Sequence, residues 1–442
     1  MSQRNGLCSV RKAKGHEYKR TLSRRRVPGL GVKRRVSPSG MKAPAGERHV
    51  VTGLFAGIGG LERGLRRAGH ETVLFCENDA AASAVLRARF NDVPLHDDIC
   101  TLRRLPRAAS LVVAGFPCQD LSQAGMTRGI AGARSGLVGQ VFRLIDEHRT
   151  PWVLLENVPF MLQLARGEAM NVITSAFEER GYRWAYRVVD ARAFGLPQRR
   201  RRVYFLASHG GDPRTVLFAD EAGDPELPQD HRGELACGFY WTEGLRGLGW
   251  AVDAVPTLKG GSTIGIPSPP AIVMPNGHVV TPDIRDAERL QGFPTDWTRP
   301  AEKVAKRGVR WKLVGNAVSV PAASWIGRRL VRPGRPIAFD VALLEGHRQW
   351  PTAAWNIGAG RMRVHASEWP VHRRYRSLHD FLQYPTTPLS PKATSGFLQR
   401  AALAKLRFPP GFLELLRDHH QKLTTKNTID VGETGLENFA TA

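Results

Sequence analysis

Short apolar runs alternate with helical stretches from Val50 to Ile99, and this alternation constrains the fold more than any other feature of the 442-residue chain. The run VVTGLF is followed by LERGLRRAG, in which apolar residues recur at helical spacing, and ETVLFC, AAASAVLRARF and VPLHDDI continue the pattern. Strands that alternate with helices form mostly parallel sheets with helices on their faces. The sequence therefore predicts an α/β fold that opens with a βαβαβ unit.

A glycine-rich turn follows the first predicted strand. Gly57, Gly59 and Gly60 lie in AGIGG, and Glu77 follows the second predicted strand. In nucleotide-binding α/β proteins such glycines let the backbone approach the ligand, and an acidic residue about 20 positions later binds ribose hydroxyls. The spacing GxGG differs from GxGxxG, so the pattern favours an adenosyl ligand over a dinucleotide. The alternative is a tight turn between strand and helix that binds nothing.

Two further apolar runs end in reactive side chains. LVVAGFPCQD carries Cys118 just after a predicted strand, and WVLLENVP carries Glu156 at the end of another. Open α/β sheets bind ligands at the carboxyl ends of their strands. We therefore expect the thiol and the carboxyl to lie near each other, although a lone cysteine beside a strand is often only a small buried hydrophobe.

Four consecutive arginines follow Gln198 in LPQRRRR, directly before the apolar run VYFLAS. Alternation along a strand would point Arg200 and Arg202 to one side and the other two arginines to the opposite side. One pair can therefore face the predicted site. The alternative is a solvated run of charge.

The chain is strongly basic, with a formal net charge of +24 and a pI near 10.6. Residues 1–49 contain 14 Lys/Arg against Glu17 and Glu47, so about half of the net charge lies there. Such clustering indicates a polyanionic partner, most simply nucleic acid. We interpret residues 1–48 as a basic, disordered tail that either contacts phosphates or only keeps the protein in solution.

The cysteines indicate neither a disulfide framework nor a zinc site. There are five, they are widely spaced, and no two of them form a CxxC pair. No apolar run approaches the roughly 20 residues that span a bilayer, and no signal peptide is apparent. We expect a cytoplasmic protein without a metal, in which Cys118 is a free thiol.

Taken in order, these motifs resemble those of DNA (cytosine-5) methyltransferases of the bacterial restriction–modification type. The resemblance runs from about Val50 to Leu330: LFAGIGG resembles the cofactor loop, GFPCQ the nucleophile loop, ENV the acid motif, and QRRRR the QxRxR motif. TPDIRDAERLQGFP resembles the motif that organises the recognition domain, and GNAVSVP resembles the last motif, which returns to the cofactor site.

The resemblance implies a Rossmann-like S-adenosylmethionine-dependent methyltransferase fold, with a mostly parallel sheet and a second, smaller domain that recognises the DNA target. It assigns catalysis to Cys118, Glu156 and Arg202, with Arg200 and Gln198 as supports. It assigns the S-adenosylmethionine site to Phe55, Gly57, Ile58, Gly59, Gly60, Glu77, Asn78, Asp98, Ile99, Pro117, Leu137, Asn316, Ala317 and Val318.

The predicted mechanism follows from the chemistry of cytosine. Carbon 5 is a poor nucleophile, so a thiolate must first add at carbon 6. A carboxyl at N3 and a cation at O2 would stabilise the charge that develops, which are the roles expected for Glu156 and Arg202. The target base must leave the duplex to react.

The predicted domains are residues 49–207 and 279–330 for catalysis and cofactor binding, and residues 208–278, rich in Gly, Pro and aromatics, for target recognition. Residues 331–442 lie outside the resemblance and form an extension of unknown role, either a small added domain that contacts DNA or a partner, or a packing extension. The expected partners are double-stranded DNA and, functionally, a cognate restriction endonuclease without a stable complex. The protein is expected to be a monomer on the nucleoid.

Three other classes of protein share some of these features. A tRNA cytosine methyltransferase would share the catalytic motifs, but the recognition segment resembles that of the DNA enzymes. A cytidine deaminase needs zinc and a PCxxC motif, whereas the chain has PCQD. A noncatalytic DNA-binding protein would not be expected to keep Cys118, Glu156 and the glycine loop together.

Overall fold

The computed structural model describes residues 46–116, 136–226, 233–261, 267–344 and 349–436, with side chains described up to residue 425. Residues 1–45 of the predicted basic tail, Pro117 and Cys118 lie outside the described residues. The structure divides into residues 1–42 and residues 43–442, and all described helices and strands belong to the second unit.

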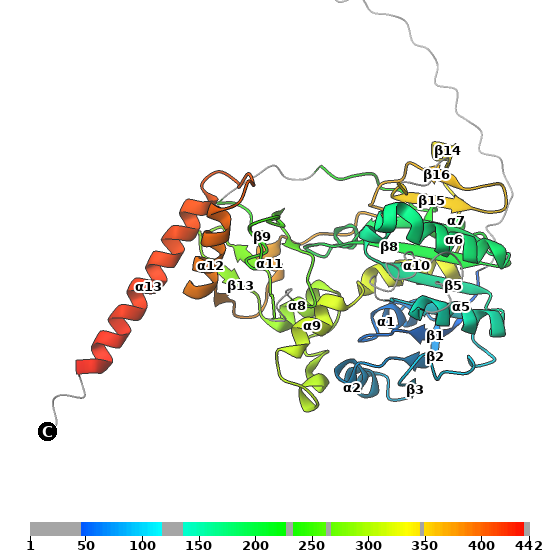
Figure 1. Cartoon of the computed structure of the whole chain (residues 1–442), viewed down its shortest axis with the longest axis horizontal. Coiled ribbons are helices and arrows are strands. Elements are labelled where there is room, and N and C mark those ends of the chain that lie inside the picture. The colour runs from blue at the N-terminus through cyan, green and yellow to red at the C-terminus, as the bar shows by residue number, and fades with distance from the viewer. Residues whose placement is uncertain (1–45, 117–135, 227–232, 262–266, 345–348, 437–442) are drawn as a thin grey trace, which may run out of the picture. The chain divides into compact units, whose positions relative to one another are not determined.

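A ten-stranded sheet forms the centre of this unit (Figure 1). Its order is β14 (Val341–Leu343), β16 (Met362–Val364), β15 (Ala353–Asn356), β6 (Arg183–Asp190), β8 (Arg201–Ser208), β5 (Trp152–Asn157), β4 (Leu111–Ala114), β1 (Val50–Leu54), β2 (Glu71–Cys76) and β3 (Leu95–His96). The strands from β3 to β5 are parallel, and β8 lies antiparallel between β5 and β6. The predicted βαβαβ opening is therefore confirmed.

Helices cover both faces of this sheet. Successive strand residues point to opposite sides, and in the central strands both sets of side chains are apolar and need cover. In β4, Val112 packs in a core with α5 (Leu137–His148) and α6 (Glu168–Glu179). The neighbouring Val113 packs on the other face with α1 (Gly60–Arg66), α7 (Arg214–Leu217) and α10 (Val320–Val331). The fold is thus the predicted layered α/β arrangement.

A third core lies beyond the end of the sheet and joins early and late parts of the chain. It packs α2 (Ala80–Arg89) against α9 (Val309–Asn316) and the 3-10 helix η4 (Arg299–Lys303). The remaining short helices are η1 (Pro159–Leu162), η2 (Leu164–Gly167), η3 (Ala191–Phe194), α8 (Ile284–Leu290) and α11 (Leu378–Phe381).

A second sheet has five short strands in the order β10 (Ala251–Val252), β9 (Cys237–Phe239), β12 (Ala271–Val273), β13 (Val279–Thr281) and β17 (Thr387–Pro388). Two helices complete its core, α12 (Pro391–Ala402) and α13 (Phe412–Leu436). The rings of Phe239 and Phe412 lie 5.0 Å apart between centroids, and those of Phe397 and Phe412 lie 5.9 Å apart. A two-stranded pair, β7 (Gln198–Arg199) with β11 (Val255–Pro256), links the segment after η3 to this region.

The C-terminal residues contribute to both sheets. Strand β15 pairs with β6 and extends the large sheet, whereas β17 pairs with β13 and closes one edge of the small sheet. In its described residues, the segment 331–442 thus adds strands to both sheets. None of the helices in the described part of the chain has the length and apolarity to cross a bilayer.

Candidate active and cofactor site

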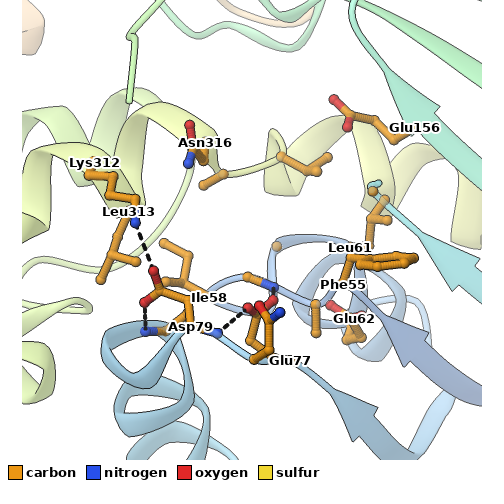
Figure 2. Close-up of a pocket in the computed structure, with 18 residues that line it drawn as sticks. Phe55, Ile58, Leu61, Glu62, Glu77, Asp79, Glu156, Lys312, Leu313 and Asn316 are labelled. Carbon is orange, nitrogen blue, oxygen red and sulfur yellow. Dashed lines mark hydrogen bonds and ion pairs between the residues drawn. The ribbon is translucent and has the colours of Figure 1, made fainter. Parts of the chain in front are cut away.

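A cavity opens at the carboxyl ends of β1, β2, β4 and β5 (Figure 2). The chain order of the strands reverses between β1 and β4, and such a switch point leaves a crevice in which α/β proteins bind ligands. Nine of the residues predicted to bind cofactor line this cavity: Phe55, Gly57, Ile58, Gly60, Glu77, Asn78, Asn316, Ala317 and Val318. The structure thus brings together the first and the last of the predicted motifs.

The glycine-rich turn bends the backbone away from β1 and forms one wall. Phe55, Gly57 and Gly59 have positive φ angles of 52°, 55° and 78°. A Cβ atom on Gly57 would meet no heavy atom within 4 Å, so its backbone borders open space. A Cβ atom on Gly60 would lie 2.7 Å from the Val318 carbonyl oxygen, so only glycine permits this close approach of the last motif.

Glu77 lies opposite the turn, and backbone groups fix its carboxylate. The Gly57 N–H donates to Glu77 Oε2 at 2.7 Å, and the Asp79 N–H donates to Oε1 at 2.8 Å. Burial raises the pKa of Glu77, and these N–H groups partly offset the shift. A carboxylate has more acceptor sites than these two bonds use, so Glu77 can still accept ligand hydroxyl groups.

An ion pair that the sequence analysis did not predict lies at another side of the cavity. Lys312 Nζ on α9 lies 2.8 Å from Asp79 Oδ2, while Asp79 Oδ1 caps α2 by accepting the N–H groups of Ala81 and Ala82 (Figure 2). The N-cap role could have been inferred from an Asp before an alanine-rich helix. The pairing with Lys312 could not, because the two residues are far apart in sequence.

Glu156 and Arg202 face each other across β5 and β8. Arg202 Nε lies 3.0 Å from Glu156 Oε1, and the side chains are 10% and 9% exposed. Burial raises the pKa of Glu156, and the positive charges of Arg202 and Arg200 partly offset this. The site therefore holds a carboxyl that takes up a proton more readily than in water, beside a fixed cation.

The residues that lead from β4 toward Cys118 lie beside Glu156 and Asn157. A Cβ atom on Gly115 would lie 3.7 Å from Glu156 Oε2, and Asn157 Nδ2 donates to the Phe116 carbonyl oxygen at 3.1 Å. Parallel pairing of β4 with β5 places Ala114 opposite Leu155. The strand that leads to the predicted nucleophile therefore ends beside the predicted acid, and the thiol itself lies outside the described residues.

Arg200 and Gln198 are buried and bind the backbone around the site. The Arg200 guanidinium donates to the carbonyl oxygens of Leu258, Gly315 and Ala317 at 3.1, 3.2 and 2.6 Å. Burial and the charge of Arg202 lower the pKa of Arg200 to about 9. Gln198 Nε2 donates to the Leu290 carbonyl oxygen at 2.9 Å, and its Oε1 accepts the Leu258 N–H at 3.0 Å.

The arginine run alternates as its strand pattern predicts. Arg200 and Arg202 are buried, whereas Arg201 is exposed and pairs with Glu368. The hydrogen bonds of Arg200 and Gln198 thus connect the segment from β7 to β8 with the C-terminal ends of α8 and α9 and with Leu258.

Four predicted cofactor residues do not line the cavity. Gly59 packs toward the Phe90 ring, and Ile99 and Leu137 belong to the core beneath α5. Asp98 is exposed and accepts the Cys100 N–H at 2.9 Å. The cavity is lined in addition by residues that the sequence analysis missed: Ala56, Leu61, Glu62, Asp79, Ala82, Gly115, Lys312 and Leu313.

The lining fits an adenosyl ligand with an amino-acid part. The open backbone at Gly57 and the acceptor sites on Glu77 suit a sugar, and Ile58 and Leu313 supply apolar surface. Within the described residues no cluster of three or more His, Cys, Asp or Glu side chains has the arrangement of a metal site.

Comparisons of the sequence with known proteins identify its family. Residues 50–235 match the family model for C-5 cytosine-specific DNA methylases. The chain is 52% identical over 366 residues to the Type II methyltransferase M2.BsuMI of Bacillus subtilis, covering 80% of this chain and 93% of that protein. It is 28% identical over 314 residues to M.SsoII of Shigella sonnei, covering 64% and 80%. Among solved structures, the Dnmt2 methyltransferase of S. pombe aligns with 64% of this chain and 98% of its own, at 17% identity and a TM-score of 0.47.

This family generally uses S-adenosylmethionine as its methyl donor. The chain belongs to the C-5 cytosine-specific DNA methylases, and it is a DNA (cytosine-5-)-methyltransferase of the bacterial Type II restriction–modification group.

Proposed function

We propose that this enzyme methylates carbon 5 of one cytosine within a short, specific sequence of double-stranded DNA, with S-adenosylmethionine as donor and Cys118 as the covalent nucleophile. The observation that carries the proposal is the Glu156–Arg202 pair at the cavity, next to the end of β4. A buried acid and a fixed cation are the two groups that a cytosine ring needs when a nucleophile attacks carbon 6.

The proposed reaction begins when the Cys118 thiolate adds to carbon 6 of a base that has left the duplex. Glu156 donates its proton to N3, and Arg202 stabilises the negative charge that develops on O2. S-Adenosylmethionine in the cavity would supply the methyl group that carbon 5 takes up and would leave as S-adenosylhomocysteine. A water molecule then takes the proton from carbon 5, the electron pair re-forms the bond between carbons 5 and 6 while the bond from carbon 6 to sulfur breaks, Cys118 leaves as the thiolate, and the N3 proton returns to Glu156.

The surroundings of Glu156 support its role as an acid. Because burial raises its pKa, a larger fraction of the carboxyl is protonated near neutral pH than in water. Arg202 lies within 3.0 Å, so the same pair presents both a proton donor and a positive charge. We propose that Arg200 and Gln198 act as positioning residues, because their hydrogen bonds go to backbone groups of the protein.

The remaining parts of the proposal concern specificity and setting. We propose that residues 208–278, including the small-sheet strands β9, β10 and β12, read bases through the major groove, while Lys and Arg side chains hold phosphates. We further propose that a companion restriction endonuclease exists, that the enzyme acts as a monomer without binding it stably, and that it acts on nucleoid DNA in the cytoplasm.

Two measurements test the proposal. Incubation with labelled S-adenosylmethionine and plasmid DNA, followed by bisulfite sequencing, is expected to map methylation to one cytosine in a single short context. Labelled DNA without conversion-resistant cytosines would place the methyl group elsewhere and contradict the proposal.

The covalent step is tested with a duplex that carries 5-fluorocytosine at the mapped position. Fluorine cannot leave carbon 5 as a proton does, so the bond to sulfur should persist. Mass spectrometry is expected to find one DNA adduct per protein, on the peptide that contains Cys118. Turnover on ordinary DNA without an adduct on the fluorinated duplex would contradict covalent catalysis.

A further inference from the structure

Among the described residues, four acidic side chains line the cavity, and only one of them is without a partner. Glu77, Asp79 and Glu156 are held by the hydrogen bonds and ion pairs described above. The remaining acid is Glu62 on α1, and the described part of the chain offers neither carboxylate oxygen a hydrogen-bond partner in another residue.

The local backbone accommodates this carboxyl. Glu62 is 1% exposed, and a Cβ atom at Gly53 in β1 would overlap Glu62 Oε1. A glycine inside a strand often marks such a close approach. The side chain therefore occupies a space between α1 and β1 that any larger residue at position 53 would fill, and it lines the same cavity as Phe55 and Glu77 (Figure 2).

A buried carboxyl group without a hydrogen-bond partner costs free energy, and a ligand that pairs with it can offset that cost. Burial raises the pKa of Glu62 to about 8, the negative charge of Glu77 adds to the shift, and the backbone N–H of Glu62 itself opposes it. Two unpaired acceptor oxygens at this depth match a group that carries both positive charge and N–H donors.

We propose that the Glu62 carboxylate binds the α-ammonium group in the methionine part of S-adenosylmethionine. This inference rests on the proposed cofactor. The sulfonium centre has no hydrogen to donate, and ribose hydroxyls carry no charge, whereas the ammonium group supplies three donors and a full positive charge. Glu62 is thus a binding residue for the end of the cofactor that takes no part in the transfer.

Proton balance follows from this assignment. At pH 7 the free Glu62 carboxyl is mostly neutral, and it must lose its proton to form the ion pair, so binding releases a proton to solvent. Between pH 6 and 8 the affinity should therefore rise with pH, by at most about tenfold per unit. The other charged groups that line the cavity are Glu77, Asp79, Lys312 and Glu156, and Glu156 pairs with Arg202.

The test is titration calorimetry on the full chain with two ligands. S-Adenosylhomocysteine carries the ammonium group but no sulfonium charge, and 5′-methylthioadenosine has the adenosine and sulfur but no amino acid. In Glu62→Gln, a neutral side chain of the same shape, the affinity for S-adenosylhomocysteine at pH 8 is expected to fall about 10- to 100-fold. The affinity for 5′-methylthioadenosine is expected to stay within about twofold, which also shows that the variant folds.

Glu71→Gln serves as the matched control, because Glu71 is an exposed acid at the start of β2 and should leave both affinities unchanged. Proton release is measured at pH 7 from the dependence of the binding enthalpy on the buffer. It should occur for S-adenosylhomocysteine with the wild type and disappear in Glu62→Gln.

The outcomes separate this inference from the proposed function. Unchanged affinity for S-adenosylhomocysteine in Glu62→Gln, or an equal loss for both ligands, would overturn the role of Glu62 while leaving the cofactor in place. Failure of both ligands to bind the wild type would instead contradict the proposed cofactor site.

Discussion

The cavity region and the small sheet are held together by different kinds of contact. Around the cavity, side chains at the ends of β1, β2, β5 and β8 form hydrogen bonds and ion pairs, such as Glu156 with Arg202. The core of the small sheet is aromatic, and Phe412 contacts four other rings, those of Phe239, Trp250, Phe397 and Phe408. A charge removed from the first region should change chemistry with little effect on folding, whereas a ring removed from the second should do the reverse.

The largest effect on chemistry is expected for Cys118→Ser. A serine hydroxyl has a much higher pKa than a thiol and is not ionised at neutral pH, so methyl transfer should fall by at least about 10⁴-fold while specific DNA binding remains. Methyl transfer is measured with labelled donor, and DNA binding by gel shift on the mapped site. Cys100→Ser, at an exposed cysteine, should leave both unchanged. Turnover near the wild-type rate in Cys118→Ser would remove the thiol from the mechanism.

The next largest effect should come from Glu156→Gln, which keeps the shape of the side chain but cannot give a proton to N3. We expect kcat to fall by about 10²- to 10⁴-fold, with the melting temperature nearly unchanged. Steady-state kinetics and calorimetric melting measure the two quantities. Glu179→Gln, an exposed acid on α6, is the control. A large loss of stability with normal kcat would reverse the contrast between the two regions.

Phe412→Ala tests the aromatic core of the small sheet. The side chain is 2% exposed, and removing a buried phenylalanine costs about 3–5 kcal/mol, so the small sheet and its helices should unfold at lower denaturant. Binding of S-adenosylhomocysteine should persist, because every described residue that lines the cavity lies outside this core. Hydrogen exchange resolved by peptide measures the local loss, with Leu403→Ala, 79% exposed, as the control. Equal loss of protection in β1 and β9 would show that the two regions unfold as one.

The smallest effect is expected from deleting residues 2–42, a segment with 13 Lys/Arg and one acid that belongs to neither region. If these residues contact phosphates, the slope of log affinity against log salt should decrease by several units at most, since each neutralised phosphate contributes about 0.9. The methylated sequence should stay the same. The measurements are DNA affinity at several salt concentrations and bisulfite maps of methylation, each for the full-length and the truncated protein. A changed target sequence would mean that recognition extends beyond the small sheet, and an unchanged slope would mean that the tail does not bind DNA.

The sequence predicted the large sheet well because its information is local. Strands β1, β2, β4 and β5 are mostly apolar runs bounded by turn residues, and the polar groups of the site lie at the strand ends, as Glu77 and Glu156 do. Parallel pairing then brings these ends to one edge of the sheet. The position of the cavity therefore follows from residues that are read one segment at a time.

The features that the sequence did not reveal depend on long-range contacts. Strand β17 has two residues, Thr387 and Pro388, and its sequence carries no strand pattern. Glu62 stands in LERGLRRAG, where a charged residue looks like part of a solvated helical face. The one local signal for the burial of Glu62 is Gly53, a residue without a side chain inside strand β1. The sequence around Lys312 did not indicate that this residue lines the cavity, because nothing near it in the chain identifies Asp79 as its partner.

The small sheet also has a consequence for the order in which the molecule is made. Strands β9, β10, β12 and β13 leave the ribosome well before β17, α12 and Phe412, which complete their sheet and core. All described residues that line the cavity precede Phe397. Because a chain is synthesised from its N-terminus and its domains fold as they emerge, the cavity can be complete while the small sheet still lacks its last strand. Translation thus separates the two regions in time, and an enzyme released early by a truncated message would carry a formed cavity and an unclosed small sheet.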